Sequence, residues 1–152
     1  MGYSTDEARQ DLLDIVAEAI DELADALAAL GEAYEQLDEH NADKLEAQLF
    51  RPVQIAYGRA KRAHAGFAER VGLASRAFEP AAPGAPSTGA RGFVEGAVKA
   101  VAAADVVLST LQDSMLPVEV GDRELRAGIG EVRELVAPLP ARARDIVRTL
   151  GR

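Results

Sequence analysis

Several polar residues fall on or beside apolar helical patterns, where they could form the floor of a binding pocket. Asp105 interrupts an otherwise uncharged segment and projects onto the margin of an apolar arc, as does Gln112. A half-buried carboxylate needs a hydrogen-bond donor. If the two helices that carry them are antiparallel, Tyr57 lies level with Asp105, and Arg62 and His64 lie within two turns. We predict a structural hydrogen bond at Asp105, or alternatively a small-molecule pocket lined by these residues.

An arginine and a histidine occur close together in Arg59-Ala-Lys-Arg-Ala-His64, on a segment with helical periodicity. This Arg-x4-His pattern resembles the signature of the HEPN ribonucleases, helical bundles whose arginine and histidine act on an RNA phosphodiester. The resemblance implies that His64 would transfer a proton and Arg59 would bind the phosphate charge. Ala60 stands where that family usually has a polar residue. The alternative is that His64, at the edge of the apolar face, forms a hydrogen bond with a neighbour.

Metal and cofactor chemistry finds little support in the residue types. A ferritin-like dimetal site requires Glu-x-x-His pairs, but Leu37 and Lys61 precede His40 and His64 at that spacing. The chain has no cysteine, which excludes disulfides, thiolate metal sites and thiol catalysis. Phosphate-binding loops and serine-hydrolase motifs are also absent. We expect neither metal nor cofactor, with a carboxylate-only Mg²⁺ or Ca²⁺ site on the acidic first helix as the alternative.

Charge is divided unevenly along the chain, whose net charge is −8. Residues 1–46 hold 14 acidic and 2 basic residues, whereas residues 47–152 hold 11 acidic and 15 basic residues. Arg51, Arg59, Arg62 and Arg70 project onto one face, opposite the apolar residues of the same helix. This basic stripe is a candidate surface for an anionic protein partner or for the acidic helix of a second copy. We do not expect nucleic-acid binding, because the pI is about 4.8 and Tyr57 is the only aromatic residue nearby.

The element that opens the chain is a long amphipathic helix, predicted over residues 5–38. Ser4 and Glu7 have the spacing of a capping box at its start. Acidic residues repeat on the side opposite the apolar stripe, so this helix must bury one face against other helices. The apolar stripe consists of Leu13, Val16, Ile20, Leu23, Leu27, Leu30, Tyr34 and Leu37.

A second helix is predicted over residues 42–72, with Asn41 as its cap and Gly72 as its stop. Pro52 lies inside this pattern and should kink the helix, because proline removes a hydrogen-bond donor and clashes with the preceding turn. Residues 74–88 are rich in proline, glycine, serine and alanine and are predicted to form a long loop. This loop is either a simple turn or a crossover along the molecule.

Two further helices are predicted, over residues 89–115 and 122–150. Ser87 or Thr88 could cap the first of them, and Asp122 the second. Pro138 and Pro140 should bend or break the last helix. The chain is therefore predicted to be a single domain, residues 1–152, folded as an all-α, antiparallel four-helix bundle of long helices.

The most direct functional interpretation is a non-enzymatic interaction or assembly module. Apolar arcs on several helices are broad enough to accept more than one neighbour, which favours a homo-oligomer and most simply a dimer. No apolar run approaches the ~20 residues of a membrane span, and the first residues do not resemble a secretion signal, so we expect a cytoplasmic protein with no membrane contact. A ligand-binding or sensor bundle around Asp105 and a HEPN-like ribonuclease are the alternatives.

Overall fold

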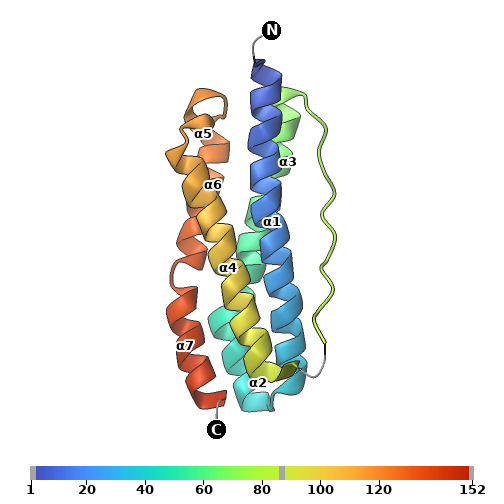
Figure 1. The fold of residues 1–152 in the computed structure, drawn as a ribbon, viewed down its shortest axis with the longest axis vertical. Coiled ribbons are helices and arrows are strands. Elements are labelled where there is room, and N and C mark those ends of the chain that lie inside the picture. Colours follow the sequence, from blue (N-terminus) through green and yellow to red (C-terminus); the bar gives the residue numbers. More distant parts are fainter. Residues whose placement is uncertain (1–2, 86–87, 151–152) are drawn as a thin grey trace.

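A computed structural model describes residues 3–85 and 88–150 of the chain, and these residues are all-α, with no strand among them. The main helices lie side by side, with their axes roughly along the long axis of the molecule (Figure 1). The elements in chain order are α1 (Thr5–Gln36), α2 (Glu39–Leu45), a π-helix η1 (Glu46–Phe50), α3 (Arg51–Val71), α4 (Gly89–Asp113), α5 (Leu116–Glu119), α6 (Arg123–Val136) and α7 (Leu139–Leu150).

Helix α1 begins where the capping pattern indicates. The Ser4 hydroxyl accepts a hydrogen bond from the Glu7 amide at 3.0 Å, which satisfies one of the free donors of the first turn. The apolar stripe is buried from Leu13 to Leu23 and again at Leu30, and the most extensive helix packing in the molecule joins α1 to α4. This long contact places the centre of the core between α1 and α4.

The second helical segment is longer than predicted and contains an irregularity. It begins at Glu39, with Asp38 rather than Asn41 at the N-cap position; Asn41 instead donates a side-chain hydrogen bond to Asp38 Oδ1 at 2.6 Å. The five residues of η1 directly precede Pro52, which occupies the first turn of α3. A π-helical turn there accommodates one extra residue without interrupting the helix.

The connection between α3 and α4 is an extended segment that runs along most of the length of the molecule (Figure 1). We call its described part, residues 73–85, the strap. Gly72, which ends α3 and directly precedes the strap, has φ +73°, a left-handed conformation that glycine adopts without steric cost. The strap returns the chain to the end of the molecule where α3 began, so α3 and α4 run in the same direction (Figure 1).

Helix α4 is entered and left through irregular turns. Thr88 precedes it, but its side chain forms no capping hydrogen bond; the other predicted cap, Ser87, lies outside the described residues. The chain then passes through the short α5 to Gly121, where a Cβ atom would lie 2.4 Å from the Pro117 carbonyl oxygen. Only glycine fits this turn, which leads into α6. There, the predicted cap is present: Asp122 accepts a hydrogen bond from the Leu125 amide at 2.9 Å.

The last predicted helix consists of two helices, since α6 ends at Val136 and α7 begins at Leu139. Pro138 lies between them. Helix α6 packs mainly on α3, and α7 packs mainly on α4. Gly128 permits the first contact, because a Cβ atom at this position would lie 2.7 Å from Ala63 Cβ. The second contact brings Val98 of α4 and Ala143 of α7 to the walls of one groove.

Candidate functional site

Asp105 forms a hydrogen bond between helices, as a half-buried carboxylate requires, but its partner was not predicted from the sequence. Its Oδ1 accepts a hydrogen bond from Arg133 Nε of α6 at 2.9 Å. A second nitrogen of the same guanidinium donates to Gln112 Oε1 at 2.7 Å. Asp105 also raises the pKa of Arg133 through this hydrogen bond. One guanidinium thus joins both polar residues on the margin of α4 to α6.

The structure does not bring Asp105 together with Tyr57, Arg62 or His64. That pocket assumed that the helices carrying them are antiparallel neighbours, whereas the strap makes α3 and α4 run in the same direction (Figure 1). Helix α3 packs mainly on α6 and α1, and α4 packs mainly on α1 and α7. Arg133 was missed because α6 carries several arginines, and nothing in the sequence singles out the one that reaches Asp105.

His64 is buried, with 2 % of its surface exposed. Its ring meets that of Phe78, on the strap, edge to face with the centroids 5.1 Å apart. Its Nδ1 has no hydrogen-bond partner among the described residues. Burial lowers the pKa of the imidazole, and the nearby charge of Arg76 lowers it further. His64 therefore favours the neutral form beneath the strap.

Arg59 and His64 do not share an open cleft. Arg59 pairs with Glu131 of α6, and its guanidinium packs where a side chain on Gly128 would lie. Five residues along an α-helix correspond to a rotation of about 140°, so the two side chains leave α3 on different sides. A general acid or base must reach its substrate. The buried imidazole and the paired guanidinium give the ribonuclease alternative no support.

The basic stripe of α3 is largely neutralised within the chain. Arg70 binds Asp122 through two hydrogen bonds of 2.6 and 3.0 Å, and this interaction lowers the pKa of the carboxyl. Arg51 lies 3.8 Å from Glu46 in a more exposed pair. Among the described residues, only Arg62 of the four stripe arginines has no ion pair. The opposite charges along the chain thus serve in part to attach α6 to α3.

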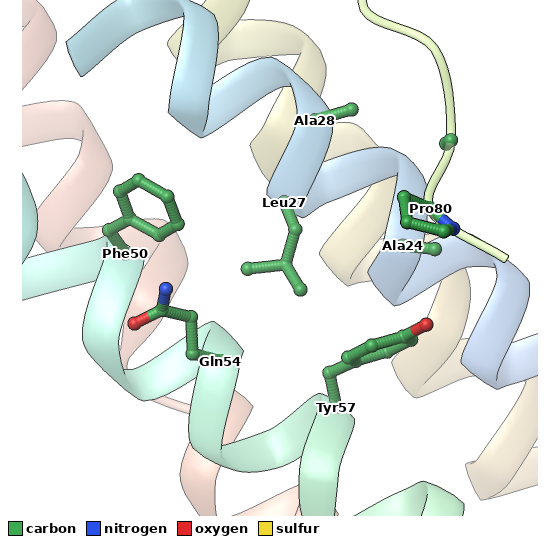
Figure 2. Close-up of a pocket in the computed structure, with 8 residues that line it drawn as sticks. Ala24, Leu27, Ala28, Phe50, Gln54, Tyr57 and Pro80 are labelled. Atoms are coloured by element: carbon green, nitrogen blue, oxygen red, sulfur yellow. The ribbon is translucent and has the colours of Figure 1, made fainter. Parts of the chain in front are cut away.

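Tyr57 lies at a pocket that the sequence did not predict, between α1, α3 and the strap. Figure 2 shows Leu27 pointing from α1 into the space between Phe50 and Tyr57, with Pro80 of the strap above Ala24. The cavity has a volume of about 270 Å³. Burial raises the pKa of the Tyr57 hydroxyl, and Asp21 raises it further. The lining residues are Ala24, Leu27, Ala28, Phe50, Gln54, Tyr57, Pro80 and Ala81.

A second concave surface lies between α4 and α7. Val98, Ala143 and Val147 contribute apolar side chains to a groove of about 480 Å³. Glu95 of α4 and Arg144 of α7 stand on its opposite walls. The sequence contained a signal for this surface, because α7 alternates arginines with a regular apolar stripe; the partner helix could not be predicted from it.

No group of three or more histidine or acidic residues that could hold a metal ion occurs within residues 3–85 and 88–150. The same part of the chain contains no helix that is both long and apolar enough to cross a membrane. Comparisons with protein-family models, with curated proteins and with solved structures find no match to this chain. Its function must therefore be inferred from the surfaces of the molecule itself.

Proposed function

We propose that this protein is a non-enzymatic assembly module, an antiparallel four-helix bundle that forms a homodimer in the cytoplasm. The interface in this proposal lies on α4 and α7, not on the basic stripe of α3. The ion pairs of Arg59 and Arg70 within the chain are the reason for this choice, because a stripe that is already paired has less charge to offer a partner.

The observation that carries the proposal is an apolar row on the outer face of α4. Val98, Ala102 and Val106 are spaced by four residues and therefore lie along one side of the helix. Val106 is 63 % exposed, although valine is among the residues most often buried. Val98 also lines the groove between α4 and α7, so the row and the groove form one continuous surface. We call this surface the α4/α7 face.

Charge at the rim of the α4/α7 face favours a second copy as the partner. Glu95 and Arg144 stand on opposite walls of the groove; Glu95 forms an ion pair with Arg91 of its own helix, whereas Arg144 forms none with another described residue. In a two-fold dimer, each contact occurs twice, so Glu95 of each copy could face Arg144 of the other. A surface that carries both signs of charge around an apolar centre can thus be complementary to itself.

The test compares two substitutions of exposed apolar residues by glutamate. Val106→Glu places a charge at the exposed end of the apolar row on the α4/α7 face and should convert a dimer to a monomer, with dissociation at least tenfold more favourable. Ile55→Glu is the matched control, because Ile55 is 50 % exposed on α3, away from that face. Light scattering after size-exclusion chromatography measures the mass of both variants. Loss of the dimer in both variants, or in neither, would contradict this interface.

A further inference from the structure

We propose that the pocket between α1, α3 and the strap binds a small aromatic molecule that carries one hydrogen-bonding group. This inference is independent of the dimer, because the pocket and the α4/α7 face share no residue. The pocket joins three segments distant in sequence: the middle of α1, the beginning of α3 and residues Pro80 and Ala81 of the strap (Figure 2).

The size of the pocket selects a small molecule as its occupant. A cavity of about 150 Å³ is large enough to bind benzene. The space here, about 270 Å³, suits a molecule of one or two fused rings. A helix of a partner protein, about 10 Å in diameter with its side chains, is too large for it. Pro80 and Ala81 of the strap form one side of this space.

The walls favour an aromatic ring. Phe50 and Tyr57 stand on either side of Leu27, which points into the space between them (Figure 2), and the small residues Ala24 and Ala28 of α1 also line this space. Aromatic rings gain from edge-to-face and offset contacts with other rings in addition to the area they bury. A ligand ring beside Leu27 could make such a contact with Phe50 or Tyr57.

The polar groups of the pocket favour a ligand that carries one hydrogen-bonding group. The Gln54 amide and the Tyr57 hydroxyl both line the space, and neither forms a hydrogen bond with another described residue. Small-molecule sites are typically apolar with a few such convergent polar groups. A hydroxyl or amide group on the ligand meets this requirement.

The π-helix provides an independent indication of function at this place. π-Helical turns are rare and occur frequently at functional sites. Here η1 ends at Phe50, the residue that forms one aromatic side of the pocket. Phe50 is also held by an edge contact with Tyr34, with 6.2 Å between ring centroids. The extra residue of the π turn therefore helps to set the position of a pocket wall.

Fluorescence titration with 2-naphthol tests the proposal directly, because the chain has no tryptophan to interfere. We expect saturable binding of one molecule per chain. Ala28→Phe fills the slot and should weaken binding at least tenfold, whereas Ala65→Phe, the same change at an exposed position of α3, should alter it less than twofold. Should Ala28→Phe fail to fold, Ala81→Phe fills the pocket from the strap without changing a helix.

Two further variants distinguish binding in this pocket from binding elsewhere on the molecule. Gln54→Leu should weaken binding of 2-naphthol severalfold and leave binding of naphthalene, which has no hydroxyl group, unchanged. Val147→Glu, on the α4/α7 face, should bind 2-naphthol like the unaltered protein. The proposal is overturned if 2-naphthol does not bind saturably, or if Ala28→Phe and Ala65→Phe have equal effects. Loss of binding in Val147→Glu would assign the probe to the α4/α7 face and would also overturn it.

Discussion

Arg133 of α6 and Asp105 of α4 are joined side chain to side chain, with Nε 2.9 Å from Oδ1, across 28 residues of sequence. The same guanidinium holds Gln112 at 2.7 Å. Two helices with limited direct packing are thus linked by one planar group with several donors. The link fixes the position of α6 relative to α4, while the packing of α6 on α3 supplies most of its apolar contact.

A double-mutant cycle on this pair should give a small but measurable coupling energy. Asp105 and Arg133 side chains are 37 % and 35 % exposed, so solvent screens much of their attraction, and we expect about 0.5–1 kcal/mol from Asp105→Asn and Arg133→Gln. Urea unfolding of the two single variants and the double variant measures it. The pair Arg51 and Glu46, outside the α4/α7 face, serves as control, since it is more exposed and should couple by about 0.3 kcal/mol. Equal coupling in both pairs would show that the Asp105 interaction has no special structural role.

The contact between α3 and α6 should not tolerate a methyl group at Gly128. A Cβ atom there would lie 2.7 Å from Ala63 Cβ, so the helices must separate, and Gly128→Ala should destabilise the protein by about 1–3 kcal/mol. Gly130 lies on the same helix with no atom within 4 Å of the corresponding position. Gly130→Ala should therefore stabilise the protein by up to about 1 kcal/mol through helix propensity. Thermal unfolding shows whether each substitution lowers or raises the stability of the protein. A Gly128→Ala variant as stable as the unaltered protein would contradict the close contact.

The buried imidazole of His64 should make stability depend on pH in a defined interval. Burial lowers its pKa below 6.5, so the unfolded chain takes up a proton at a higher pH than the folded chain does. The contribution of His64 is fully present above about pH 6.5 and is lost as the pH falls toward the folded pKa. Because His64 binds one proton, it cannot change the free energy of unfolding by more than about 1.4 kcal/mol per pH unit.

Urea unfolding between about pH 5 and pH 8 checks this pH dependence. His64→Leu should remove it, whereas His40→Gln, at an exposed position of α2, should retain it. The difference between variant and unaltered protein isolates His64 from the other groups of the chain. An unchanged slope in His64→Leu would mean that this imidazole is not the group responsible.

Some helix starts and ends were predictable from sequence because they depend on local interactions, whereas Asn41 is not the N-cap of α2 and Thr88 forms no capping hydrogen bond. Ser4 and Asp122 cap the helices that they were expected to cap, and Gly72 ends α3 in the left-handed conformation. The proline at position 138 lies between α6 and α7, where the sequence indicated a bend or break. In each case, one or two neighbouring residues determine the backbone, so no knowledge of the tertiary structure is needed.

The candidate sites were less predictable because they depend on which helices are neighbours. A loop as long as residues 74–88 permits a turn or a crossover, and only the crossover makes α3 and α4 run in the same direction. Because the connection is a crossover, Asp105 pairs with Arg133 of α6 and not with a residue of α3. The crossover also places the strap over His64 and beside Tyr57. The π-helix has no comparable sequence signature, so the position of Phe50 could not be derived.

The central claim, that the α4/α7 face joins two copies of this chain, is tested most directly by sedimentation equilibrium of the unaltered protein. The proposed interface is mainly apolar, so we predict a species of twice 16.1 kDa at micromolar concentration that persists in about 0.5 M salt. A dimer that dissociates in salt would instead place the interface on paired surface charges. A single species of 16.1 kDa at every concentration and salt level would contradict the assembly function.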